Sequence, residues 1–208
     1  MADFYPYLIA SLPMLHFGIK PPFSFERFLE VCRQFIPEKD FQLLCTLPQP
    51  VQYSEKGRRH PIIQKWVEFD GALRNELVRI RAARRHREPA TYLRPGGYTG
   101  SSLAPVVTAA TMQASLLDAE MNLDEIRWKA LEDLATGHYF DLDVLITYAY
   151  QLLILQRWEQ IRSADGTVLL EQALHHCRGI NARTEKRLHY QNRRQHGDGQ
   201  FRCSGDAE

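Results

Sequence analysis

Two histidines and a cysteine near the C-terminus carry the side chains that most often bind transition metals. His175, His176 and Cys177 are consecutive, and Cys203 or His196 could complete a ligand set. Structural zinc sites need two ligand pairs at fixed short spacing on a rigid loop. The residues around these partners have little apolar content, so the loop would not be rigid. We therefore expect neither a metal site nor a cofactor.

A second pattern with possible chemistry is the Asp-Leu-Asp pair formed by Asp141 and Asp143. Paired carboxylates at this spacing can bind Mg²⁺ in helical enzymes that use acidic clusters. No second acidic cluster at helical spacing faces them, whereas a carboxylate at the start of a helix caps free N–H groups and interacts favourably with the helix dipole. Capping is the preferred interpretation, and a metal-dependent enzyme remains the alternative.

A run of arginines is the third candidate. Their guanidinium groups could grip phosphates, but the run lies at the C-terminal end of an expected helix, where cations are favoured in any protein. The net charge is only +1, and no aromatic residues interleave with the arginines. We therefore favour an acidic protein partner or a solvated surface over nucleic acid. The predicted partner-binding residues are Arg74, Arg79, Arg81, Arg84, Arg85 and Arg87.

No catalytic motif accompanies these residues. The glycines at 96, 97 and 100 lack the Gly-Lys-Ser/Thr ending and the preceding strand of a phosphate-binding loop, and no serine stands in a Gly-x-Ser-x-Gly turn. Cys32 and Cys45 fall on apolar helix faces, where a small buried side chain is expected. The sequence predicts a protein that is not an enzyme.

The elements of the N-terminal half follow from capping residues and prolines. Residues 4–17 could form a short helix or an extended strand. Ser24 is a plausible N-cap for a helix that ends at Pro37, and a short helix is expected over 39–47. Pro61 then begins a long amphipathic helix running towards Arg87, about 40 Å in length. Its expected apolar stripe is Ile62, Trp66, Phe69, Leu73, Leu77 and Ile80, and its expected polar face is Lys65, Glu68, Asp70, Arg74, Arg79 and Arg81.

In the C-terminal half, residues 88–104 have the composition of a linker between two helical layers. A helix is expected over 104–117, and a second is predicted to begin at Asn122, because Glu125 three residues later completes a capping-box pattern. A third, beginning after Asp141, is apolar nearly all round and is expected to be central. A short helix over 167–176 precedes the tail.

The composition is that of an ordinary globular protein, with 44% hydrophobic and 25% charged residues. We predict an all-α bundle of about six to seven helices, with a single domain over 1–177 and a disordered basic tail over 178–208. The longest near-apolar run, 144–155, falls short of the roughly 20 residues that a membrane span requires. Cytoplasmic residence is expected, with a peripheral position at the inner membrane as the alternative.

Four strings carry a resemblance that composition does not. They are Tyr-x-Tyr-Leu-Ile-Ala-Ser-Leu-Pro-Met-Leu (5–15), Lys-Pro-Pro-Phe-Ser-Phe-Glu-Arg-Phe-Leu-Glu (20–30), Leu-Arg-Asn-Glu-Leu-Val-Arg-Ile-Arg (73–81) and Gly-His-Tyr-Phe-Asp-Leu-Asp (137–143). Together they resemble an uncharacterised bacterial family encoded among the genes of V/A-type ATPases. The similarity extends over about residues 4–175.

Within those gene clusters the family looks like a divergent, shortened counterpart of the C (or d) subunit, the all-helical funnel that joins the central rotor shaft to the membrane ring. The resemblance implies a non-catalytic coupling part whose partners are the other subunits of a V/A-type ATPase. It supplies no catalytic residues. A helical nucleic-acid-binding or regulatory protein that uses the segment from Arg79 to Arg87 is the alternative.

Overall fold

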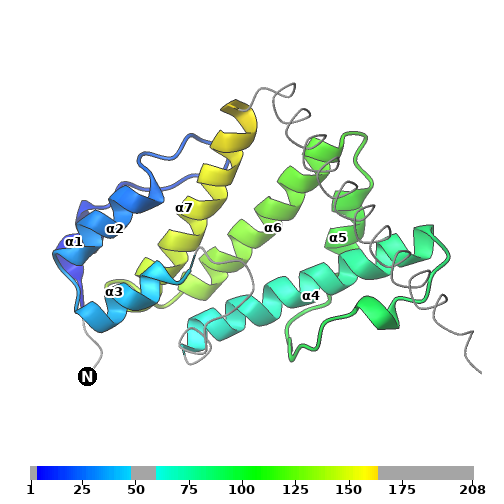
Figure 1. Ribbon diagram of the computed structural model, residues 1–208, viewed down its shortest axis with the longest axis horizontal. Coiled ribbons are helices and arrows are strands. Elements are labelled where there is room, and N and C mark those ends of the chain that lie inside the picture. The colour runs from blue at the N-terminus through cyan, green and yellow to red at the C-terminus, as the bar shows by residue number, and fades with distance from the viewer. Residues whose placement is uncertain (1–3, 48–59, 164–208) are drawn as a thin grey trace, which may run out of the picture. The chain divides into compact units, whose positions relative to one another are not determined.

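The computed structural model describes residues 4–47 and 60–163, and these residues form seven α-helices and one 3-10 helix with no strand. This confirms the predicted all-α fold (Figure 1). The chain divides into two units, residues 1–160 and 161–208, and all but the last three of the described residues belong to the first unit. The predicted helix over 167–176 and the predicted tail over 178–208 lie outside the described residues.

The N-terminal segment, which the sequence left open between helix and strand, forms helix α1 (Pro6–Ser11) with Leu8 buried. Proline at the first helical position fits because that position needs no hydrogen-bonded N–H. Helix α2 (Phe25–Arg33) begins as predicted, with the Ser24 side chain accepting a hydrogen bond from the backbone N–H of Arg27 at 3.2 Å.

Helix α2 stops before the predicted Pro37, and helix α3 (Glu38–Cys45) follows. In the residues between them, Phe35 is 53% exposed and Ile36 is buried. Cys32 is fully buried as expected, but Cys45, the last residue of α3, is exposed.

Helix α4 (Pro61–Arg84) is the long helix that Pro61 predicted, and its 24 residues span about 36 Å. Its apolar stripe from Ile62 to Leu77 is buried as expected. The helix ends three residues earlier than predicted, in a C-terminal turn closed by two hydrogen bonds. The N–H of His86 donates to the carbonyl of Ala83, and the N–H of Arg87 donates to the carbonyl of Ala82. His86 adopts φ +50°, a conformation that usually selects glycine.

The segment after α4 returns along that helix. It contains the 3-10 helix Ala90–Tyr92 and is tied to α4 by Asn75, whose amide donates to the carbonyl of Arg94 and accepts from its N–H, both at 2.9 Å. Tyr98 then packs edge-on against Phe69 of α4. The glycine-rich segment predicted as a linker therefore lies along α4.

Two helix boundaries in the C-terminal half were predicted wrongly. Helix α5 (Ala104–Thr111) is shorter than expected, and helix α6 (Leu116–Ala135) starts before the predicted Asn122. The reason is Ser115, whose hydroxyl accepts from the N–H of Leu117 at 3.2 Å, with Asp118 in the first turn where the dipole favours an acid. Asn122 and Glu125 therefore lie inside α6.

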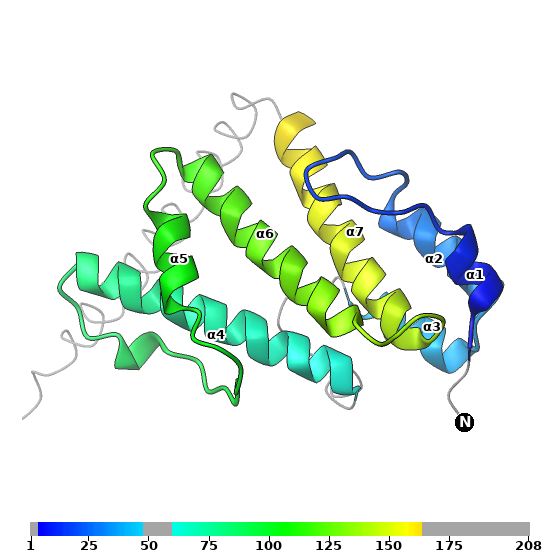
Figure 2. The same ribbon diagram turned by 180° about the vertical axis from the view of Figure 1, so that it is seen from behind.

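Helix α7 (Leu142–Ser163) is central, as its sequence predicted. Leu145, Ile146, Ala149 and Leu152 belong to a core shared with α1, α2, α3 and the start of α4. Further along, Ile154, Leu155 and Trp158 belong to a second core with α4, α5 and α6. Both views show α6 and α7 side by side and α4 crossing α6 (Figures 1 and 2). One helix thus joins the two cores.

None of the helices in residues 4–47 and 60–163 combines the length and the apolar character that a membrane span needs.

We expect His86→Gly to stabilise the protein by roughly 0.5–1 kcal/mol, because glycine adopts a positive φ without the steric cost that an L side chain meets. Urea denaturation at 25 °C measures the change. His86→Ala is the matched control: it removes the imidazole but keeps a Cβ at positive φ, so it should not stabilise. Equal stabilisation by both variants would contradict the backbone explanation.

A second prediction concerns pH. Burial, and then the nearby Cys45, raise the pKa of Cys32 from 9.0 to about 12. The folded chain therefore keeps a proton that the unfolded chain loses above pH 9. The contribution of Cys32 to the free energy of unfolding is present below pH 9 and is lost as pH rises towards 12. The stability difference between wild type and Cys32→Ala should shrink by roughly 1 kcal/mol from about pH 7 to about pH 10. A pH-independent difference would contradict this cause.

Candidate functional site

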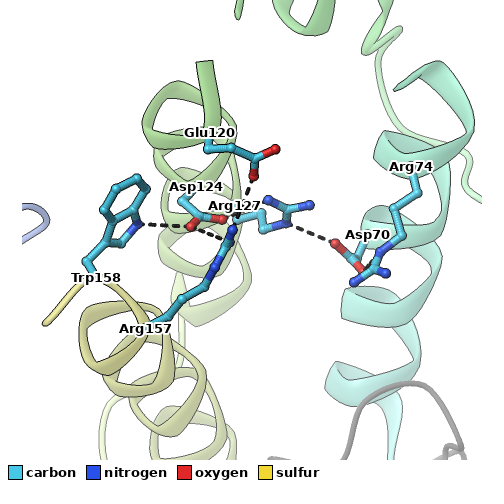
Figure 3. Close-up of polar contacts among 7 residues, drawn as sticks. All are labelled: Asp70, Arg74, Glu120, Asp124, Arg127, Arg157 and Trp158. Atoms are coloured by element: carbon cyan, nitrogen blue, oxygen red, sulfur yellow. Dashed lines mark hydrogen bonds and ion pairs between the residues drawn. The ribbon is translucent and has the colours of Figure 1, made fainter. Parts of the chain in front are cut away.

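A chain of buried ionic contacts connects α4, α6 and α7 (Figure 3). Two aspartates form its centre: Asp70 of α4, 6% exposed, and Asp124 of α6, 1% exposed. A buried carboxylate is costly unless charged or hydrogen-bonding partners surround it. Both aspartates have such partners, and we call the whole set the ionic network. Its members are Asp70, Arg74, Glu120, Asp124, Arg127, Arg157 and Trp158.

Asp70 binds one arginine from its own helix and one from α6. Its Oδ2 accepts from Nε of Arg74 at 2.6 Å, four residues along α4. Its Oδ1 accepts from Nε of Arg127 at 3.0 Å, across the interface with α6. Arg127 therefore holds α4 and α6 together through a charge-assisted hydrogen bond, which is stronger than a neutral one.

Asp124 performs the same function between α6 and α7. Its Oδ1 accepts from Nη1 of Arg127 at 2.7 Å, and its Oδ2 accepts from Nη1 of Arg157 at 2.8 Å and from the indole N–H of Trp158 at 2.9 Å. Arg157 also donates to Glu120 at 3.2 Å. Three donors from two helices thus surround one carboxylate (Figure 3).

The network balances its own charge, with three carboxylates set against three guanidinium groups. Burial alone lowers the pKa of Arg127, but the charges of Asp70 and Asp124 and their hydrogen bonds outweigh it and raise that pKa. Arg127 therefore stays charged in the interior. The paired charges of the network therefore tie three helices together.

Sequence reasoning did not identify this network, although the spacing of its aspartates carried a signal. Asp70 was placed on the polar face of its helix, yet it stands four residues after Trp66 and three before Leu73, which are both on the apolar stripe. Asp124 follows the buried Leu123 directly. An acidic residue at an apolar position predicts a buried partner, and only the three-dimensional arrangement identifies that partner as Arg127.

The six arginines predicted to bind a partner divide into two groups. Arg74 belongs to the ionic network, Arg79 pairs with Glu76, and Arg84 donates to the carbonyl of Thr111 at 3.2 Å. The other three are exposed and make no side-chain hydrogen bond or ion pair within residues 4–47 and 60–163. We call them the exposed arginines: Arg81, Arg85 and Arg87.

The acidic pair lies at the start of α7, with Asp141 just before the helix and Asp143 in its first turn. Asp141 caps α7 as predicted, since its Oδ1 accepts from the N–H of Val144 at 3.2 Å. His138, which no sequence pattern singled out, contacts both Asp141 and Asp143. The other metal-type residues, from His175 to Cys177 with His196 and Cys203, lie outside the described residues.

Comparison with known proteins finds a family model, described as "Protein of unknown function (DUF2764)", that matches residues 102–176. The match covers less than half of the 208 residues and includes α5, α6 and α7, and hence the Asp124 half of the ionic network. No curated protein and no solved structure matches the chain.

We expect Asp124→Ala to destabilise the protein by about 3 kcal/mol, because Arg127 and the indole N–H of Trp158 lose a buried acceptor while Arg127 keeps Asp70 and Arg157 keeps Glu120. Glu125→Ala is the control on the next residue. Glu125 makes an exposed pair with Lys129 at 2.7 Å, and its loss should cost about 0.5 kcal/mol. Urea midpoints compare the two variants, and similar costs would show that the network does not hold the helices together.

Proposed function

We propose that this chain is a non-catalytic coupling part of a V/A-type ATPase, placed at the central stalk in the manner of the C (or d) subunit. The single observation that carries the proposal is the ionic network, which ties the 24-residue helix α4 to α6, and α6 to α7, while the end of α4 presents exposed arginines. A coupling part transmits force between other proteins. It needs stiff elements with charged, exposed ends rather than a pocket that binds substrate.

Rigidity follows from where the ionic network lies. It crosses two helix interfaces, α4 with α6 and α6 with α7, next to the apolar side chains of the second core. Sliding or rotating either interface would take a buried aspartate away from its arginine partner, which costs several kcal/mol. The three helices are therefore expected to move as one body when force is applied to the end of α4.

The charge at that end supports a protein partner. The exposed arginines follow one another within seven residues at the C-terminal end of α4, where the helix dipole adds negative potential that they offset. An acidic surface on a shaft or ring protein would pair with them and would gain association rate from long-range attraction. The resemblance supports the same assignment, since the string over 73–81 lies on α4 and the string over 137–143 forms the turn before α7.

The test is co-purification of the ATPase from cells that express a tagged copy of this chain. We expect the other ATPase subunits to be recovered with wild type, and Arg81→Glu with Arg85→Glu to reduce that recovery about tenfold, which is about 1.4 kcal/mol of binding free energy. Lys39→Glu with Lys65→Glu is the matched control, because both lysines are exposed and lie away from this end.

Deletion of the gene gives the second readout, namely ATP-driven ion transport in membrane vesicles. Normal transport in the deletion strain, or no ATPase subunits recovered with the wild-type chain, would refute the proposal. The nucleic-acid alternative makes a different prediction: binding to duplex DNA or RNA at low salt that falls steeply as salt rises and that the Arg81 and Arg85 changes abolish.

A further inference from the structure

Four side chains of kinds that commonly bind metal ions lie close together near the start of α7. His138, Asp141 and Asp143 each direct one ligand atom to a common region, and these three atoms lie within 4.8 Å of one another. His60, which directly precedes α4 and is 78 residues from His138, reaches the same group through its Nε2, 3.4 Å from Asp143 Oδ1. Three separate segments thus contribute to one cluster.

We propose that His138, Asp141 and Asp143 bind a divalent transition-metal ion, with His60 as the outer partner that orients Asp143. This site is independent of the proposed function. Nδ1 of His138 lies 2.6 Å from Asp141 Oδ2 and 3.2 Å from Asp143 Oδ2. A four-coordinate metal with bonds of about 2.0–2.2 Å to N and O ligands places those ligand atoms about 3.4 Å apart, so on binding the Asp141 contact would lengthen by about 0.8 Å and the Asp143 contact by about 0.2 Å.

Each carboxylate has its Oδ1 next to another group and its Oδ2 next to Nδ1 of His138. Asp141 Oδ1 accepts from the N–H of Val144, and Asp143 Oδ1 faces His60 Nε2. Fixed outer contacts of this kind are what orient the ligands that touch the ion in metal sites. Nδ1 of His60 is buried and has no hydrogen-bond partner within the described residues, and Nε2 is the ring atom that faces the cluster.

The exposure of the three ligand side chains and their chemical types indicate which ion would bind. The three ligand side chains are between 22% and 35% exposed, so an ion can enter and keep water at its remaining positions. One imidazole with two carboxylates suits Zn²⁺, Fe²⁺ or Mn²⁺ better than Mg²⁺, which prefers oxygen alone. On binding, neutral His138 coordinates through a bare Nδ1 and carries its proton on Nε2.

The experiment is calorimetric titration of the full chain with Zn²⁺ and, in parallel, with Mg²⁺. We expect one Zn²⁺ equivalent with a Kd of about 1 μM or tighter and no Mg²⁺ signal. His138→Ala and Asp143→Asn should abolish that equivalent. His60→Ala should weaken it by about 10- to 100-fold, the effect expected for the loss of an outer partner.

Two controls separate this site from other metal-type residues. His86→Ala should leave the Zn²⁺ equivalent unchanged, because His86 lies at the far end of α4. The triple variant His175→Ala, His176→Ala, Cys177→Ser should also retain it. Absence of Zn²⁺ binding, or binding that only the triple variant removes, would overturn the proposal. So would an equivalent that His138→Ala and Asp143→Asn leave in place while circular dichroism shows both variants folded.

Discussion

The structure depends on one buried carboxylate. Asp124 is 1% exposed and accepts hydrogen bonds from three donors that belong to α6 and α7. Burying such a group without partners would cost several kcal/mol, and Arg127, Arg157 and Trp158 together offset that cost. Because each donor can satisfy Asp124 from a single direction, this requirement specifies the register of α6 against α7. Apolar packing alone tolerates many registers.

The position of α7 explains why this register matters. The first half of α7 packs into the core of α1, α2 and α3, and its second half packs with α4, α5 and α6. Leu145 and Leu152 contribute to one core, Leu155 and Trp158 to the other, and both pairs are almost fully buried. A change of register at Asp124 would displace side chains in both cores. The ionic network therefore constrains the packing of helices that it does not contact.

Capping residues and periodicity predicted most of the fold, whereas partners distant in sequence decided the sites. Ser24, Pro61 and Asp141 each began a helix as expected, because their local chemistry satisfies helix ends whatever the tertiary context. The start of α6 was predicted wrongly because a local pattern does not show which of two competing caps is used. At the sites, the decisive partners are Arg127 for Asp70 and His60 for Asp143, which lie 57 and 83 residues away. Local spacing shows that a charge stands on an apolar face, which predicts a partner but does not identify it.

The division of charge between the interior and the surface gives the molecule its functional character. The arginines of the ionic network are paired with carboxylates, so they hold helices together and contribute little external field. Arg81, Arg85 and Arg87 are exposed at the C-terminal end of α4, so their charge is accessible to another protein. The net charge of +1 therefore does not show how these charges are distributed: the ionic network holds helices in place, and the exposed arginines at one end of α4 are accessible. The proposed coupling role needs this combination, because a charged end on a helix tied to its neighbours can recognise another protein by position as well as by sign.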